Sequence, residues 1–106
     1  MTASFLYVTA GSEEEALAIG RALVEDRLAS CANVLPGTTA VYWWEGAVQD
    51  DREAVLIVKT RLDLMEELTD RVCKLHSYDL PCVVGLPLSE GNPEYLAWVR
   101  AETKPN

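Results

Sequence analysis

One segment, residues 30–46, constrains the fold of this chain more than any other. It reads SCANVLPGTTAVYWWEG, and its second half is rich in β-branched and aromatic residues, which are typical of a half-buried strand. Pro36 cannot donate a hydrogen bond to a neighbouring strand and Gly37 tolerates a positive φ, so the pair predicts a bulge or bend. Side chains alternate across a strand, so the three consecutive aromatic residues cannot all face one core. At least one ring therefore needs a covering surface from outside its own fold.

Length and composition predict a single globular domain over residues 1–106. Of these residues, 49% are hydrophobic and 25% are charged, which suffices for a two-layer core. Seventeen acidic residues against nine basic ones give a net charge of −8, which argues against nucleic acid and membrane surfaces as partners. No stretch approaches the roughly 20 apolar residues of a membrane-spanning helix. The first ten residues lack the basic and apolar regions of a signal peptide.

The three cysteines indicate a reducing compartment. Cys31, Cys73 and Cys82 are odd in number and far apart, and none of them belongs to a C-x-x-C pair. This spacing disfavours both a disulfide framework and a structural zinc site. We therefore expect three reduced thiols and a cytoplasmic location.

The first half of the chain predicts a strand followed by a helix. The strand covers Ser4–Ala10, a short apolar run that ends before a glycine. Ser12 and Glu15 form a capping-box signature, and further acidic residues in the first turn suit the positive end of a helix. Gly20 lies inside this helix, where it costs up to ~1 kcal/mol relative to alanine, so we expect the helix to pack closely on a sheet.

A second long hydrophobic run, residues 53–59, predicts a strand that forms a hairpin with the first segment. The turn lies either at Glu45–Gly46 or at Asp50–Asp51, and the sequence allows both. Thr60 and Asp63 predict the start of a second helix. The expected core positions of that helix are Leu64, Leu68, Val72 and Leu75.

The last part of the chain completes the order of elements. A fourth strand is predicted over Cys82–Leu86, and Asn92 and Pro93 predict the start of a short final helix. The order strand, helix, strand, strand, helix, strand, helix indicates an α+β protein with the split βαβ arrangement of the ferredoxin-like fold. Right-handed crossovers place both main helices on one face of the antiparallel sheet. The other face is left bare, and oligomerisation is the simplest way to cover it.

Several motifs, in this order, closely resemble those of the CutA family, the divalent-cation tolerance proteins. They are Ala29-Ser30-Cys31-Ala32-Asn33-Val34 with Pro36-Gly37, Tyr42-Trp43-Trp44-Glu45-Gly46, Val58-Lys59-Thr60, His76-x-Tyr78-x-x-Pro81, Leu86-Pro87 and Tyr95-Leu96-x-Trp98. The resemblance covers essentially the whole chain. It implies a ferredoxin-like fold, a homotrimer in which long hairpins extend neighbouring sheets, and an association with copper tolerance and divalent metals. It implies no well-defined enzymatic activity.

One segment departs from the family pattern, which reads His-Pro-Tyr-Glu-x-Pro-Glu. Here Ser77 replaces proline, Asp79 replaces the first glutamate and Cys82 replaces the second. If that second glutamate belongs to a site between subunits, a soft sulfur has replaced a hard oxygen ligand. Such a site is then either lost or shifted in preference toward Cu(I) or zinc.

The residues and the resemblance together give two groups of candidate site residues. The candidate ligands for copper or another divalent cation are His76, Cys31 and Cys82. Each also has a structural interpretation, His76 as the cap of a helix end and the cysteines as packing residues. The candidate residues of a subunit interface or cleft are Tyr42, Trp43, Trp44, Glu45, Lys59, Tyr78 and Trp98. For Lys59 the structural alternative is a side chain that simply extends to water.

The sequence contains no Gly-rich phosphate loop, H-E-x-x-H or G-x-S-x-G motif, so we expect a binding protein and not an enzyme. The leading hypothesis is a trimeric cytoplasmic protein that binds copper or another divalent cation and contributes to cation tolerance. The alternative is a trimeric signalling or scaffolding protein whose intersubunit clefts bind a small metabolite or a partner protein. The nitrogen-regulatory PII proteins share that general architecture, an analogy at the level of the fold.

Overall fold

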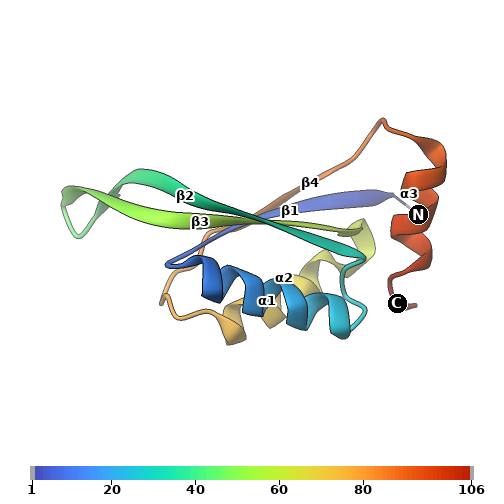
Figure 1. The fold of residues 1–106 in the computed structure, drawn as a ribbon, viewed down its shortest axis with the longest axis horizontal. Helices are drawn as coiled ribbons and strands as arrows, with labels where there is room; N and C mark the ends of the chain where they lie inside the picture. Colours follow the sequence, from blue (N-terminus) through green and yellow to red (C-terminus); the bar gives the residue numbers. More distant parts are fainter. Residues whose placement is uncertain (1, 106) are drawn as a thin grey trace.

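The computed structural model describes residues 2–105 and contains a four-stranded sheet with two long helices on one of its faces (Figure 1). Its elements are β1 (Ala3–Ala10), α1 (Glu13–Glu25), β2 (Cys31–Trp44), β3 (Ala47–Arg61), the short 3-10 helix η1 (Leu62–Leu64), α2 (Met65–Leu75), β4 (Val83–Pro87) and α3 (Pro93–Ala101). The strands lie in the order β2-β3-β1-β4, and every neighbouring pair is antiparallel. This order confirms the predicted ferredoxin-like α+β fold.

The core lies between the sheet and the helices α1 and α2. Alternate residues of the central strands point into it, because successive side chains of a strand face opposite sides. Its fully buried members are Leu6, Val8 and Ala10 from β1, Ala54, Leu56 and Val58 from β3, Ala16, Ile19 and Leu23 from α1, and Leu68 and Val72 from α2. Burying a leucine, isoleucine or valine side chain contributes about 1.5–3 kcal/mol, so this layer supplies most of the stability of one chain.

The start of α1 follows the predicted capping box in part. The Ser12 hydroxyl accepts a hydrogen bond from the Glu15 backbone N–H at 3.1 Å, as expected. The Glu15 carboxylate accepts from the backbone N–H of Gly11 at 3.2 Å. Gly20 faces the sheet, where an added Cβ would lie 2.9 Å from Leu56 Cδ1 and 3.0 Å from Ala32 Cβ. The predicted close approach of this helix to the sheet is confirmed.

The hairpin of β2 and β3 is longer than predicted and extends beyond the helices (Figure 1). A register shift between Leu35 and Thr38 marks the predicted bulge, where Gly37 has a φ of 75°. The turn lies at Glu45–Gly46, which have φ angles of 50° and 79°, and Trp44 pairs with Ala47 across it. Two consecutive positive φ values define the tight turn that suits the twist of paired strands.

Three sequence predictions at element ends are wrong. Thr60 does not cap a helix: it belongs to β3, and its buried hydroxyl donates to the Leu28 carbonyl at 2.6 Å. The strand continues because Arg61 still pairs with Ala3 of β1, and α2 begins only after the 3-10 turn. Leu75, expected in the core, is exposed at the last position of α2. Cys82 precedes β4 and is also exposed, so it is not a packing residue of that strand.

The final helix, α3, begins as predicted. The Asn92 side chain accepts from the backbone N–H of Glu94 at 3.0 Å, and Pro93 occupies the first helical position. The helix stands at the end of the sheet where β1 begins and β3 ends (Figure 1). No helix in residues 2–105 is long and apolar enough to cross a membrane.

We expect Gly20→Ala to destabilise the protein even though alanine favours helices. The gain in helix propensity is at most ~1 kcal/mol, whereas overpacking against Leu56 and Ala32 costs about 1–3 kcal/mol. Urea denaturation at a fixed protein concentration should show a free energy of unfolding lower by ~1 kcal/mol. A variant more stable than the parent would contradict the close packing of α1 on the sheet.

Candidate functional site

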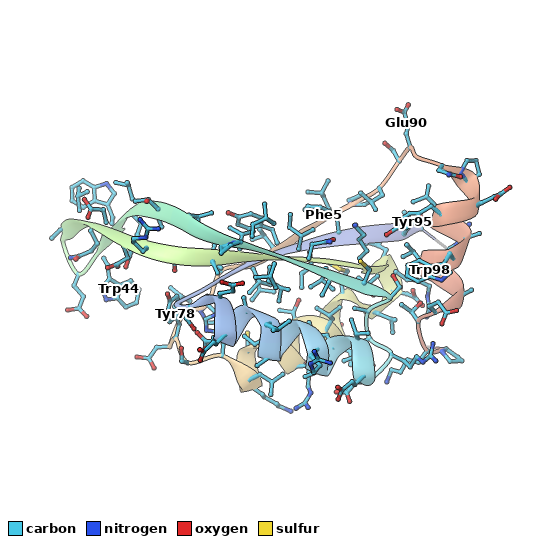
Figure 2. All side chains as sticks on the ribbon, in the orientation of Figure 1. Phe5, Trp44, Tyr78, Glu90, Tyr95 and Trp98 are labelled. Carbon is cyan, nitrogen blue, oxygen red and sulfur yellow. The ribbon has the colours of Figure 1, made fainter. Side chains whose placement is uncertain are left out.

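The face of the sheet opposite α1 and α2, here called the bare face, carries apolar side chains from three strands. In one row, Phe5 of β1 lies between Leu86 of β4 and Lys59 of β3. In the next row on the same face, Tyr7 of β1 lies between Val84 of β4 and Ile57 of β3. Leu86 and Val84 are 55% and 58% exposed. Figure 2 shows Phe5 on the side of the sheet away from the two helices. This apolar surface has no covering layer within the described chain.

The far half of the hairpin carries aromatic residues that the core does not use. Trp43 is 74% exposed, and its cross-strand partner Val48 is exposed as well. The Tyr42 hydroxyl donates to the Asp51 carboxylate, and this hydrogen bond raises the pKa of Tyr42. Trp44 lies beyond the end of the helices (Figure 2). The structure thus leaves apolar surface open on the hairpin, as the three aromatic residues predict.

His76 is buried and makes two hydrogen bonds inside the chain. Its Nε2 lies 2.7 Å from the Thr9 carbonyl, and its Nδ1 accepts from the backbone N–H of Tyr78 at 3.1 Å. A carbonyl can only accept, so Nε2 carries the hydrogen and Nδ1 does not. His76 is the C-cap of α2, as predicted if its role is structural. Its ring, however, forms hydrogen bonds with β1 and with the following loop, and not with the carbonyls of the helix. Binding a metal ion would require His76 to release one of these two bonds.

The loop after α2 is fixed by two carboxylates. Glu15 accepts from the backbone N–H of Ser77 at 2.9 Å, and Glu53 accepts from the Tyr78 hydroxyl at 2.7 Å. Burial and the bond to Glu53 raise the pKa of Tyr78. For Glu15, burial opposes ionisation, but the hydrogen bonds from Ser77 and Gly11 outweigh it and lower the pKa. Tyr78, predicted as an interface residue, is therefore tied to its own chain through Glu53.

The structure does not bring the three candidate metal ligands together. Cys31 lies in β2 beside Lys59, in the row of Phe5, whereas His76 contacts Thr9 four residues further along β1. Cys31 is only half-buried, and its thiol donates to Asn33 Oδ1 at 3.7 Å. All three cysteines are free thiols. Within residues 2–105 there is no group of three or more histidine, cysteine or acidic side chains that could hold a metal ion.

A polar cluster at one corner of the bare face, here called the Lys59 corner, consists of Cys31, Asn33, Lys59, Tyr95 and Trp98. Lys59 Nζ donates to Asn33 Oδ1 at 3.0 Å and lies 5.6 Å from the centroid of the Tyr95 ring. The rings of Tyr95 and Trp98 are 5.5 Å apart and lie beside the end of the sheet (Figure 2). Sequence reasoning included Lys59 and Trp98 but missed Asn33 and Tyr95. The two-residue spacing of Cys31 and Asn33 in one strand could have placed both on one face.

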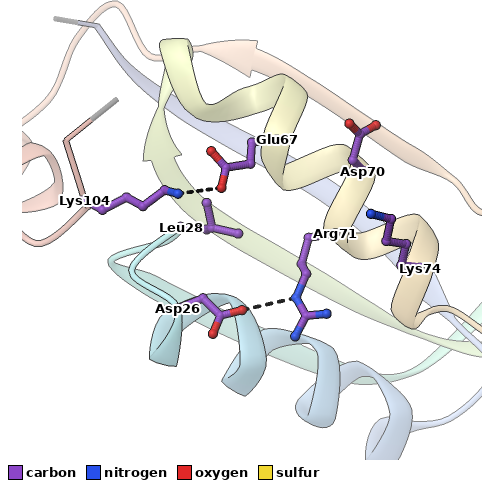
Figure 3. A pocket seen from close by; sticks show the side chains of 7 residues that line it. All are labelled: Asp26, Leu28, Glu67, Asp70, Arg71, Lys74 and Lys104. Carbon is purple, nitrogen blue, oxygen red and sulfur yellow. Dashed lines mark hydrogen bonds and ion pairs between the residues drawn. The ribbon is translucent and has the colours of Figure 1, made fainter.

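A hollow with a volume of about 490 Å³ lies between the end of α1 and α2 (Figure 3). It is lined mostly by charged side chains that already have partners. Arg71 pairs with Asp26 at 3.1 Å, and Lys104 pairs with Glu67. These exposed pairs contribute little individually, and they leave the hollow without a strong feature for ligand recognition.

We expect Glu15→Gln to lower the stability of the chain by about 1–2 kcal/mol at pH 7, because charge-assisted hydrogen bonds to a loop are weakened. The folded pKa of Glu15 is below its ordinary value of 4.5, so its contribution is complete above that value and is lost as the pH falls through the folded pKa. The variant should therefore show a flatter dependence of stability on pH below 4.5. Glu14→Gln, an exposed neighbour, is the control. Identical pH profiles for the two variants would contradict this role of Glu15.

Comparison with known proteins identifies the family. The family model described as CutA1 divalent ion tolerance protein matches residues 4–102. The divalent-cation tolerance protein CutA of Thermus thermophilus is 49% identical over 96 residues, which are 91% of this chain and 93% of that protein. The chloroplastic protein CutA 1 of Oryza sativa is 42% identical over 99 residues, but the chain spans only 56% of its length.

Solved structures agree with the observed fold. The divalent cation tolerance protein from Thermus thermophilus has a TM-score of 0.93 at 46% identity, and the match covers 96% of this chain and 99% of that one. CutA1 from Oryza sativa has a TM-score of 0.97 at 40% identity, with coverage of 100% and 97%. The high structural similarity and a family match over nearly the whole chain lead to one conclusion. This chain belongs to the CutA family of divalent-cation tolerance proteins.

Proposed function

We propose that this protein is a homotrimer that binds copper or another divalent cation between its subunits and so contributes to cation tolerance. The observation that carries this proposal is the apolar bare face of the sheet, which one chain cannot cover. The proposed role is binding and not catalysis. Membership of the CutA family supports the connection with divalent cations.

A second copy of the chain is the occupant that fits the bare face. The face is broad and extends over several strands, and a closed symmetric assembly covers it in every copy at once. The projecting hairpin also needs cover, because Trp43 and Val48 lie largely in water. A hairpin that lies against the next copy covers both surfaces, and such head-to-tail contacts close into a ring. We propose three copies because the resemblance to the CutA family implies a homotrimer.

A metal site in this assembly would draw ligands from more than one copy. The thiols of Cys31 and Cys82 are accessible in a single chain, whereas His76 has both ring nitrogens engaged. Thiolates are soft ligands and favour Cu(I) over hard divalent ions. Copper is therefore the proposed metal, with the two cysteines as its first candidate ligands and His76 as a third that must rearrange.

The cytoplasm is the proposed location. Cys73 and Cys82 are exposed free thiols, and such thiols remain reduced in a compartment buffered by glutathione. The excess of acidic residues supports partners other than nucleic acid or an anionic membrane surface.

The Lys59 corner favours a second candidate function, the binding of a small ligand at an intersubunit cleft. Its cation, amide and two aromatic rings lie at the edge of the bare face, where a neighbouring copy would form the opposite wall. This arrangement supports a signalling or scaffolding role of the kind that PII-like trimers have, by analogy of fold.

We expect Trp43→Glu to weaken the trimer while leaving the fold of each chain intact. Trp43 is 74% exposed in its own chain, so its packing is available only to another copy. Buried tryptophans at interface centres typically contribute about 2 kcal/mol or more. Size-exclusion chromatography over a dilution series should show the variant dissociating at a concentration at least tenfold higher than the parent.

The matched control is Leu80→Glu, which also places a charge at an exposed apolar residue. Leu80 is 73% exposed but lies in the loop after α2 and does not belong to the hairpin strands. We expect this control to dissociate like the parent. Equal dissociation of Trp43→Glu and the parent would contradict the role of the hairpin in assembly.

Copper titration tests the metal proposal directly. We expect Cys31→Ser and Cys82→Ser each to lower the affinity for Cu(I) at least tenfold, because a hydroxyl is a poor ligand for a soft ion. Cys73→Ser, which alters an exposed thiol on α2, should bind copper like the parent. The measurement is a competition titration with a chromogenic Cu(I) chelator. Unchanged affinity in both of the first two variants would overturn the assignment of the ligands.

A further inference from the structure

Within residues 2–105, Lys59 is one of five basic residues without an ion pair, the others being Arg21, Arg52, Lys74 and Arg100. Arg61 is paired with Asp63 at 2.9 Å, and Arg27, Arg71 and Lys104 also form ion pairs with carboxylates. Lys59 is half-buried, and its ammonium contacts an amide oxygen and an aromatic ring. Among residues 2–105 it has no ion-pair partner. In a chain with seventeen acidic residues, this ordered cation lacks the counter-ion that its chemistry favours.

The polar groups left available around Lys59 are donors. The Asn33 side-chain oxygen already accepts from both Lys59 and Cys31, while its NH₂ group makes no hydrogen bond within the described residues. The indole N–H of Trp98 is likewise without a hydrogen-bond partner in that part of the chain, and an indole can only donate. The Asn33 NH₂ group and the Trp98 indole are therefore donors without an acceptor, and they accompany the Lys59 ammonium at this corner. An acceptor with negative charge is the complementary group.

An apolar wall stands beside these donors. The rings of Tyr95 and Trp98 lie 5.5 Å apart with an angle of 34° between their planes, and they remain 39% and 42% exposed. Phe5 lies in the same row of the bare face as Lys59, directly across from it on β1. Exposed ring faces of this kind stack on planar apolar groups. The corner therefore combines a cation with a surface for a flat ring.

We propose that the Lys59 corner binds a small organic anion that carries a carboxylate on a planar apolar body. The carboxylate accepts hydrogen bonds from Lys59 and from the Asn33 amide, and the planar body lies on the rings of Tyr95 and Trp98. Cys31 borders the site, where its thiol donates to the Asn33 side-chain oxygen. This inference rests on the second candidate function, small-ligand binding at the cleft, and names the class of ligand.

Benzoate is the probe that tests this site. Two-dimensional NMR of the full chain should show benzoate shifting the side-chain NH₂ signals of Asn33 and the indole signal of Trp98. Acetate has the charge without the ring, and benzyl alcohol has the ring without the charge. We expect each to bind at least tenfold more weakly than benzoate. Equal affinity of all three compounds, or no response of these signals to millimolar benzoate, would overturn the proposal.

Two variants separate the cation from the rings. Lys59→Gln should weaken benzoate binding at least tenfold, because a charge-assisted hydrogen bond is lost. Trp98→Leu keeps the cation and should weaken benzoate more than acetate. Lys74→Gln, which alters an exposed lysine of α2, should bind benzoate like the parent. Benzoate affinity that is the same in Lys59→Gln and the parent would overturn the site. The copper titrations leave Lys59 unchanged, so the metal and ligand proposals can fail independently.

Discussion

Both long helices cover the same face of the sheet, and most other features of the molecule depend on this one-sided packing. α1 connects β1 to β2 and α2 connects β3 to β4, and each of these strand pairs is parallel with one strand between. Right-handed crossovers then place the two helices on one side. Because side chains alternate along a strand, every buried residue such as Leu6 has a neighbour such as Phe5 on the uncovered side. The bare face is thus a direct consequence of the topology.

The sequence predicted those parts of the fold that depend on local chemistry. Ser12 caps α1, the Pro36–Gly37 pair lies at a bulge, and Gly20 allows close approach to the sheet, because each effect acts over a few residues. Features set by long-range pairing could not be predicted. Thr60 resembles a helix cap in sequence, but the pairing of β3 with β1 keeps it in the strand. Glu45 has a positive φ that its residue type does not favour, so pairing along the hairpin decided between the two possible turns.

The sequence suggests candidate site residues, but it does not show their contacts. His76 was singled out as a candidate ligand, yet its partner Thr9 lies 67 residues away in sequence, and only the fold shows that both ring nitrogens are engaged. Lys59 was also singled out, but its contacts to Asn33 and Tyr95 depend on strand register and on where α3 stands. The two proposals therefore share one residue. Cys31 is a proposed ligand of a soft metal ion and also borders the Lys59 corner, where we propose that an organic anion binds.

Both proposed functions of the protein depend on whether other copies of the chain cover the bare face and the hairpin. Sedimentation equilibrium of the unmodified protein at micromolar concentration tests this most directly. If other copies cover these surfaces, we expect a single species with three times the 11.7 kDa mass of one chain. A stable species with the mass of one chain would contradict it, because the apolar residues of the bare face and Trp43 would then remain in water.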